Sequence, residues 1–240
     1  MKFNILTLFP GLIFPFLKEG VLGRSLKKGL LDVDVVDIRS FARGKHKVTD
    51  DRPFGGGSGM VMKPGPIHRA LESVTREKSS SVILLSPQGQ KFEQPLAWKL
   101  AELEQIVLIC GRYEGVDERI IAHHVDMELS IGDYVLSGGE LGALIVLDAV
   151  ARLIPGVLGS DNSNKEDSFE CSLLKYPQYT RPRIFKGEEV PDVLLSGDHQ
   201  KIDKWRKKQS LKITLLKRPD LLKNASLSNE DKDLLAKLKE

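Results

Sequence analysis

Apolar residues along this chain gather in short, nearly unbroken runs that end abruptly in polar loops containing glycine. Two such runs cover residues 81–85 and 106–110, and residues 94–104 between them repeat apolar side chains at helical spacing. This order predicts a strand, a short helix and a second strand, joined as a βαβ unit with parallel strands. Ligands of open α/β sheets bind just beyond the carboxyl ends of such strands. We therefore expect the two polar loops to hold a small ligand.

The same pattern continues on both sides of this unit. Further strands are predicted at residues 2–9, 31–38 and 128–131, a helix at 66–75, and a Gly-, Asp- and Arg-rich loop at 45–59. The strand at 128–131 leads into a third polar loop, residues 132–139. The helix predicted next, 140–154, is apolar nearly all round and ends at Pro155 and Gly156. It should therefore be buried in a core or an interface.

Composition places the chain among ordinary globular proteins. Its 240 residues are 41% hydrophobic and 29% charged, which fits one large domain or two modest ones. No run approaches the roughly 18 apolar residues of a membrane span. Pro10, Gly11 and Pro15 interrupt the apolar N-terminus, so it is expected to form a core strand and a turn rather than a signal peptide. The two cysteines fit neither a disulfide framework nor a metal site, and a cytoplasmic location is the default expectation.

Charge is distributed unevenly along the chain. From Cys171 onward there are 16 Lys and Arg against 10 Asp and Glu, a net charge of +6 within a chain whose total is +3. Residues 201–208 form the densest basic tract, which indicates either a polyanion partner or a solvated helix face. Residues 160–168 are polar without periodic apolar positions, as is typical of a linker that becomes ordered on binding. We therefore predict domains at 1–159 and 171–240, the second small, helical and basic, with a linker at 160–170.

Several familiar kinds of site are excluded by their spacing. The glycine-rich loop at 51–60 lacks the Lys-Ser/Thr of a phosphate loop, the Gly-x-Gly-x-x-Gly of dinucleotide-binding proteins and the Gly-x-Ser-x-Gly of a nucleophile elbow. It is expected either to be a flexible turn or to approach a ligand with its backbone. His123 and His124 are adjacent rather than spaced for one helix face, so no metal site is predicted there. Cys110 ends an apolar strand and is expected to be a buried thiol.

Taken in order, the loops of this chain resemble one family closely. The matching segments are Arg-Pro-Phe-Gly-Gly-Gly-Ser-Gly-Met at 52–60, Leu-Ser-Pro-Gln-Gly at 85–89, Gly-Arg-Tyr-Glu-Gly at 111–115, Ile-Gly-Asp-Tyr-Val-Leu-Ser-Gly-Gly-Glu at 131–140 and Tyr-Pro-Gln-Tyr-Thr-Arg-Pro at 176–182. They are similar to those of the bacterial tRNA (guanine-N1)-methyltransferases, which modify guanine at tRNA position 37. Residues 206–222 match the C-terminal end of that family, so the resemblance covers essentially the whole chain.

The resemblance implies a fold, a cofactor and partners. The fold is α/β, a trefoil-knotted parallel-sheet methyltransferase domain of the SPOUT class with a small helical C-terminal domain. The implied partners are tRNA and a second copy of the chain in an obligate homodimer, without any membrane. The cofactor is S-adenosylmethionine, held where the three polar loops meet. The residues expected to bind it are Leu85, Ser86, Pro87, Gly89, Gly111, Tyr113, Glu114, Ile131, Gly132, Tyr134, Leu136, Gly138 and Gly139.

The same resemblance assigns two catalytic residues. N1 of guanine carries a proton at neutral pH, and Asp167 stands where the family's proposed base stands. Arg152 matches the arginine expected to stabilise negative charge on guanine O6. Without the resemblance, Asp167 would be interpreted as a helix N-cap and Arg152 as a solvated helix-end residue. Glu114 could order the cofactor's amino group or a cation.

Two positions depart from the family, and they leave the need for Mg²⁺ open. Ser172 stands where a glycine is usual, and Lys175 stands where an acid is usual. No metal ligands are therefore assigned, and a metal role for Glu114 or Asp167 is in doubt.

Three other functions compete with this one. They are a knotted methyltransferase acting on another base or a ribose hydroxyl, a tRNA-binding protein that has lost catalysis, and a nicotinamide dehydrogenase. The five ordered segments disfavour the first, intact Asp167 and Arg152 disfavour the second, and the missing Gly-x-Gly-x-x-Gly disfavours the third.

Overall fold

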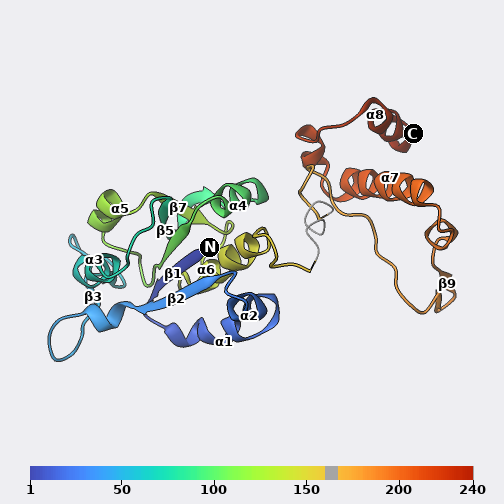
Figure 1. Ribbon diagram of the computed structural model, residues 1–240. Coiled ribbons are helices and arrows are strands. Elements are labelled where there is room, and N and C mark those ends of the chain that lie inside the picture. Colours follow the sequence, from blue (N-terminus) through green and yellow to red (C-terminus); the bar gives the residue numbers. More distant parts are fainter. Residues whose placement is uncertain (160–166, 240) are drawn as a thin grey trace. The chain divides into compact units, whose positions relative to one another are not determined.

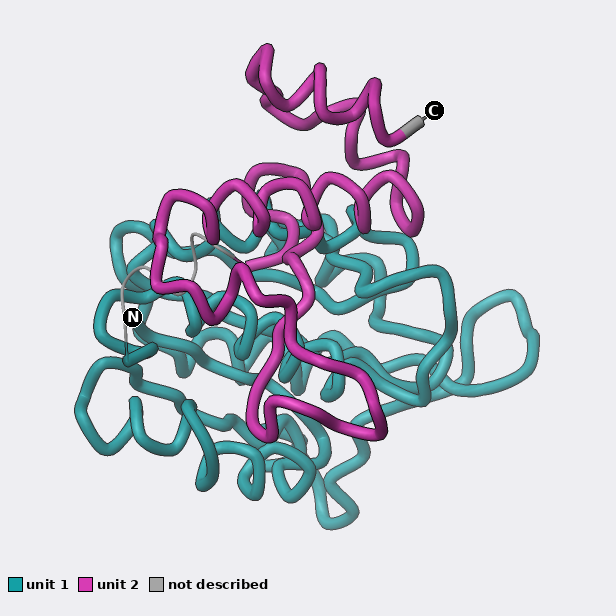
Figure 2. The backbone as a smooth tube through the Cα atoms, turned by 90° about the vertical axis from the view of Figure 1, so that its right-hand side faces the viewer, with its two compact units in different colours: residues 1–161 teal, residues 162–240 magenta. Residues whose placement is uncertain are grey.

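A computed structural model describes residues 1–159 and 167–239 of the chain. Two compact units make up the molecule, Met1–Asp161 and Asn162–Glu240 (Figure 2). Residues 160–166, which are most of the predicted linker and of the stretch expected to become ordered on binding, lie outside the described residues.

A parallel five-stranded sheet forms the centre of the first unit (Figure 1). The strand order is β2-β1-β6-β5-β7, and every pair of neighbours is parallel. The strands are β1 (Lys2–Thr7), β2 (Asp32–Asp37), β5 (Ser80–Lys91), β6 (Gln105–Cys110) and β7 (Met127–Ser130), and a separate pair joins β3 (Asp50–Asp51) to β4 (Val61–Met62). All of β6 is buried, as expected for an aliphatic strand covered on both faces of a parallel sheet.

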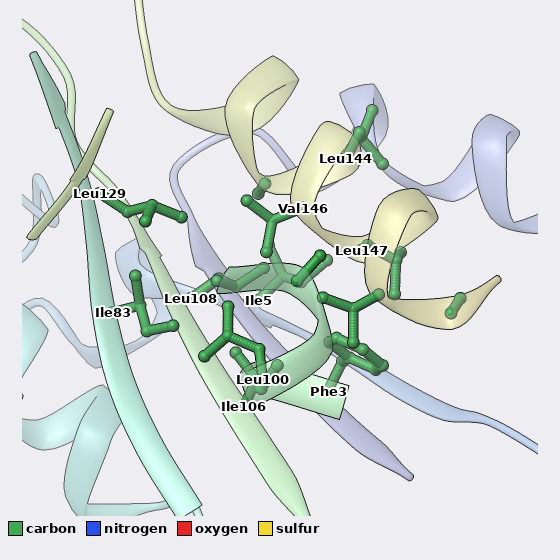
Figure 3. Packing of buried hydrophobic residues seen from close by; sticks show 14 of the residues in the cluster. Phe3, Ile5, Ile83, Leu100, Ile106, Leu108, Leu129, Leu144, Val146 and Leu147 are labelled. Atoms are coloured by element: carbon green, nitrogen blue, oxygen red, sulfur yellow. The ribbon is translucent and has the colours of Figure 1, made fainter. Parts of the chain in front are cut away.

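Helices cover both faces of this sheet. They are α1 (Phe14–Lys18), α2 (Gly20–Lys27), α3 (Pro64–Glu72), α4 (Gln94–Ala101), α5 (Glu118–His124) and α6 (Glu140–Ala151), with short 3-10 turns η1 (Pro10–Leu12) and η2 (Ile38–Phe41). Side chains of successive strand residues alternate between the two faces. Ile106 and Leu108 therefore pack with α4 and α6 (Figure 3), while Val107 and Ile109 pack with α3 and α5 on the other face.

The structure confirms the predicted βαβ unit and places the predicted strands and helices, but most of their ends differ: β1 ends at Thr7 rather than at residue 9, α3 at Glu72 rather than at 75, and α4 at Ala101 rather than at 104. Helix α6 ends at Ala151 rather than at residue 154, because the chain leaves helical geometry in turns before Pro155. Strand β5 continues past Leu85 to Lys91: its pairing with β7 shifts between Leu85 and Gln90, so the polar loop at 86–89 is an excursion within a long strand. The predicted 66–75 helix begins two residues earlier, at Pro64.

The second unit is built around helix α7 (His199–Lys217). This agrees with the prediction that the C-terminal region is helical. Asp198 caps this helix by accepting a hydrogen bond from the Lys201 amide at 3.1 Å. The other elements are a β8–β9 hairpin (Ile184–Phe185 and Glu188–Glu189), η4 (Asp192–Leu195), η5 (Pro219–Lys223) and α8 (Asn229–Lys239). Leu173, Leu211 and Leu235 form the buried centre of this unit. Helices in the described ranges are all too short or too polar to cross a bilayer.

Candidate functional site

One cavity of about 450 Å³ opens at the carboxyl ends of β5, β6 and β7. Three polar segments line it: the excursion of β5 at 86–88, the loop that follows β6, and residues 130–139 after β7. This volume suits a ligand of cofactor size. The structure therefore brings together the three loops that the sequence singled out, at the edge of the sheet where α/β proteins bind ligands.

All but one of the predicted cofactor residues line this cavity. Those that do are Leu85, Ser86, Pro87, Gly111, Tyr113, Glu114, Ile131, Gly132, Tyr134, Leu136, Gly138 and Gly139. Gly89 is absent from the described lining and packs instead against β7. A Cβ atom at Gly89 would lie 2.3 Å from the carbonyl carbon of Glu128 and 2.3 Å from the amide nitrogen of Leu129. Its lack of a side chain serves the close approach of two backbones.

Backbone contacts hold the loop after β6 against the loop after β7. Gly139 donates a hydrogen bond from its amide to the Gly111 carbonyl at 2.9 Å, and Arg112 and Gly138 form an isolated antiparallel bridge. Gly132 has a φ of +142°, which a residue with a side chain rarely adopts. The ring of Tyr134 folds back over it and donates from its hydroxyl to the Ile131 carbonyl at 3.2 Å. The wall of the cavity is thus assembled from segments more than twenty residues apart.

A buried ion pair, whose Arg112 lines this cavity, was not predicted. Arg112 meets Glu140 in a fork, with Nη2 2.9 Å from Oε2 and Nε donating to Oε1 at 3.2 Å. Glu140 is only 1% exposed and also accepts a hydrogen bond from the hydroxyl of Thr7 at 2.7 Å. The guanidinium stacks 4.4 Å over the ring of Phe9 and donates to the Ser137 carbonyl at 3.1 Å. The sequence offered one indication of this pair: a charged residue stands in each of two segments that are otherwise glycine-rich or apolar.

Glu114 joins the cavity to the glycine-rich loop. Its backbone amide donates to the Met60 carbonyl at 2.9 Å, and its side chain lies where a Cβ atom on Gly59 would have to be. Gly59 also has a φ of +81°. Glycine is therefore favoured there both by the backbone conformation and by the lack of room for a Cβ atom. The loop at 51–60 is not part of the described cavity lining. Within the described residues this loop approaches Glu114, and its approach to a ligand stays a prediction.

The two predicted catalytic residues belong to different units. Arg152 follows the last turn of α6 in the first unit, and its amide donates to the Asp148 carbonyl at 3.1 Å. Asp167 lies in the second unit, where its Oδ1 is 3.0 Å from Nζ of Lys175. The residue that departs from the family's usual acid is therefore the ion-pair partner of the predicted base.

The segment that carries Asp167 is docked on helix α7. The Leu174 amide donates to the hydroxyl of Thr214 at 2.9 Å, and the hydroxyl of Ser210 donates to the Leu174 carbonyl. The Lys175 amide donates to the hydroxyl of Ser168 at 3.0 Å. Ser172 has a φ of +53°, in the left-handed region, which explains why a glycine is common at this position. Asp167 and the basic helix therefore belong to one folded unit.

Other candidate groups prove to be structural. Cys110 is fully buried, and burial raises the pKa of its thiol well above the ordinary value, with the Glu140 carboxylate raising it further. The prediction that Cys110 is a core thiol is confirmed. His124 contacts His68 of α3 at 3.2 Å between ring nitrogens. Within residues 1–159 and 167–239, no three His, Cys, Asp or Glu side chains are grouped to hold a metal ion.

Comparison with known proteins identifies the family of this chain. The family described as tRNA (Guanine-1)-methyltransferase TrmD matches residues 1–224. A tRNA (guanine-N(1)-)-methyltransferase of Carboxydothermus hydrogenoformans is 53% identical over 235 residues, covering 98% of this chain and 92% of the relative. The enzyme of the same name from Brevibacillus brevis is 52% identical over 240 residues, covering 100% of this chain and 99% of the relative. One from Dictyoglomus turgidum is 50% identical over 239 residues, covering 100% and 97%. The chain therefore belongs to the tRNA (guanine-N1)-methyltransferase family, whose members depend on S-adenosylmethionine.

Proposed function

We propose that this chain transfers a methyl group from S-adenosylmethionine to N1 of guanine at tRNA position 37. The observation that carries the proposal is the single cavity in which the three loops typical of the family converge. Membership of the family, over nearly the full length of the chain, supports the reaction and the tRNA substrate. The position within the tRNA and the roles of individual residues rest on the resemblance of the motifs.

The residues around the cavity fit S-adenosylmethionine. Backbone groups of the glycine loops can hydrogen-bond an adenine and a ribose, and Ile131 and Leu136 supply apolar surface for the ring. One carboxylate oxygen of Glu128, which also lines the cavity, is buried without a hydrogen-bond partner in the described part of the chain. A buried acceptor of this kind calls for a donor, and the amino and hydroxyl groups of the cofactor are donors. When bound, the cofactor would supply a methyl group activated by its sulfonium sulfur.

Asp167 is proposed to remove the proton from guanine N1. As the N1–methyl bond forms and the bond from the methyl carbon to sulfur breaks, the proton moves from N1 to a carboxylate oxygen of Asp167. The ammonium of Lys175, 3.0 Å from Oδ1, restrains the orientation of this carboxylate. A carboxylate paired in this way still has a second oxygen that can accept the proton.

Arg152 is proposed to offset the negative charge that develops on guanine O6. A guanidinium is suited to this role because it stays protonated and presents several donors in one plane. Its place just after α6 fixes its backbone. No step is assigned to Mg²⁺, because the described residues offer no preformed group of ligands and the Lys175 ammonium already contacts Asp167.

Helix α7 is proposed as part of the surface that binds tRNA. Lys204 and Lys208 are exposed and lie one turn apart on this helix, where they can contact successive phosphates. Tyr179 packs 6.2 Å from Trp205 between ring centroids, and Arg206 lies 5.0 Å over the ring of Tyr176. Aromatic and guanidinium planes next to basic residues are typical of proteins that bind unpaired RNA bases.

The active form is proposed to be a homodimer with a knotted first unit. Leu141 and Ile145 of α6 are 59% and 45% exposed although the helix is otherwise buried, and Phe14 and Phe16 of α1 are exposed as well. Apolar side chains of this size on a surface support an interface. The contact between the loops after β6 and β7 supports the trefoil knot of the SPOUT class.

Transfer of a labelled methyl group to tRNA transcripts tests the proposal. Transcripts with guanine at position 37 should accept the label and those with another base there should not, and nuclease digestion should locate the methyl group on guanine N1. Label on another base or on a ribose would instead indicate a different RNA methyltransferase. Sedimentation under assay conditions tests the dimer, which an active monomer would contradict.

A further inference from the structure

The ion pair between Arg112 and Glu140 borders the cavity but has no part in the proposed chemistry. It joins four segments that are far apart in the sequence: the end of β1 through Thr7, the loop after β6 through Arg112, the loop after β7 through Ser137, and the start of α6 through Glu140. Glu140 is the first residue of an otherwise apolar helix. Burying the Glu140 carboxylate at the start of this apolar helix would be costly without a partner of opposite charge, and Arg112 is that partner.

A small number of contacts hold the loop from residue 132 to residue 139, among them the bridge of Gly138 with Arg112 and the hydrogen bond from the Tyr134 hydroxyl to the Ile131 carbonyl. Its central residues are exposed, with Tyr134 at 54% and Val135 at 85%, so burial contributes little to its position. The Gly139 amide anchors the end of the loop to the Gly111 carbonyl, and Arg112 holds the Ser137 carbonyl, two residues earlier, at 3.1 Å. The position of the Ser137 carbonyl therefore depends on the position of the Arg112 side chain.

Arg112 is held in one orientation by its other contacts. Nε and Nη2 are engaged by the two oxygens of Glu140, which leaves Nη1 directed at Ser137. The ring of Phe9 closes one face of the guanidinium. A Cβ atom on residue 138 would lie 2.1 Å from Nε of Arg112, so the glycine at that position is what allows the side chain to lie there. Lysine could not replace this arrangement, because it lacks the planar fork of donors.

We propose that Arg112 and Glu140 are positioning residues that fix the loop at 132–139 over the cofactor cavity. The carbonyl of Ser137 is held by Arg112, and the adjoining residues Leu136 and Gly138 are thereby set in the cavity wall. The inference rests on the proposed function in one respect, that S-adenosylmethionine is the ligand of this cavity. The ion pair acts on cofactor affinity through the loop, without touching the reacting atoms.

Two variants of the full-length protein distinguish positioning of the loop from stabilisation of the whole fold. Arg112→Lys keeps the positive charge and removes the fork, while Glu140→Gln keeps the shape and an acceptor for Thr7. Arg76→Lys is the matched control, because Arg76 pairs with Asp126 at 3.6 Å elsewhere in the same unit. The first readout, amide hydrogen exchange in the free protein, requires no ligand.

In Arg112→Lys, the amides of Tyr134 and Gly139, which donate to the carbonyls of Gly132 and Gly111, should exchange about 10- to 100-fold faster, the size of effect that a hydrogen bond to a charged group produces. Amides of β6 should exchange as in the wild type, and Glu140→Gln should show the same local change to a smaller degree. Wild-type exchange in the loop of both variants would overturn the proposal. Uniformly faster exchange through β1 and β6 would overturn it too, because the pair would then only stabilise the fold.

The second readout compares affinity with rate. The Kd for S-adenosylmethionine, measured by equilibrium binding, should rise about 10- to 100-fold in Arg112→Lys by the same argument. The single-turnover rate at saturating cofactor and tRNA should stay close to that of the wild type, so that KM rises while kcat is retained. An unchanged Kd with a reduced rate would overturn the positioning role. If the wild type itself fails to bind the cofactor, the proposed function fails, while the exchange readout still decides whether the pair fixes the loop.

Discussion

Replacing Gly89 by alanine is the sharpest test of how the cavity is built. The added Cβ atom would lie 2.3 Å from the backbone of both Glu128 and Leu129, whereas ordinary contacts begin at 3.4 Å. Strand β7 must therefore move away from β5 by roughly 1 Å at the place where their pairing resumes, since a backbone atom cannot rotate out of the way. Gly89 has no left-handed φ, so the effect is purely steric.

Overpacking of this kind costs about 1–3 kcal/mol. For a unit of this size, 1 kcal/mol corresponds to about 2–4 °C, so the Tm of the first unit should fall by about 2–12 °C. Because the same displacement moves the adjoining residues 86–88, affinity for S-adenosylmethionine should fall as well. Scanning calorimetry and equilibrium cofactor binding measure the two effects.

Gly11→Ala is the matched control for this substitution. Position 11 has no left-handed φ, and a Cβ atom there would meet nothing within 4 Å, so its Tm should match or slightly exceed that of the wild type. A Gly89→Ala protein with wild-type Tm and wild-type affinity would refute the reasoning, because it would mean that β5 and β7 do not approach as closely as described.

Three further predictions concern the second unit and the thiols. Asp167→Asn should slow methyl transfer by about 10²–10⁴ in single-turnover experiments, because the amide cannot take the proton from N1, and a wild-type rate would place the base elsewhere. Lys204→Ala with Lys208→Ala should flatten the log–log salt dependence of tRNA binding by about 0.7–0.9 for each lost phosphate contact, and an unchanged slope would mark a solvated face. A thiol reagent should modify exposed Cys171 and spare Cys110, whose pKa is raised by burial, and mass spectrometry that finds Cys110 modified first in the native protein would contradict its burial.

The choice of lysines follows from the structure rather than from the sequence. Lys207, which lies in the same basic tract, is 3.3 Å from Asp231 of α8, a residue that is only 6% exposed. Removing Lys207 would leave that carboxylate buried without its partner and would disturb the packing of α7 on α8. Lys204 and Lys208 avoid this complication.

The sequence predicted the elements of the first unit because local patterns determine them. A run such as residues 106–110 is apolar at every position, which is typical of a strand covered on both faces. The order of the strands was not predictable in this way, since nothing local states that β1 lies between β2 and β6. The βαβ pattern predicted that two of the loops lie at one edge of the sheet, and the resemblance to a family added the third loop to the same site.

The parts of the site that escaped prediction depend on contacts across the sequence. Arg112 and Glu140 are 28 residues apart, and no spacing rule pairs them. Gly89 was grouped with the ligand-binding glycines of its motif, whereas its close neighbour is the backbone of β7. The sequence showed that Lys175 departs from the resembled family, but not what it contacts. The structure shows that it pairs with Asp167.

The order of strands in the sheet also determines when the first unit can fold. Strand β1 is synthesised first, yet one of its neighbours is β6, with Lys2 opposite Gln105. At about 5–20 residues per second, some 5–20 s of synthesis separate the two strands. During that time the apolar side chains of Phe3, Ile5 and Leu6 lack half of their final surroundings, and closing so long a loop makes folding slow. The nascent N-terminal strand therefore stays partly uncovered until β6 has been synthesised.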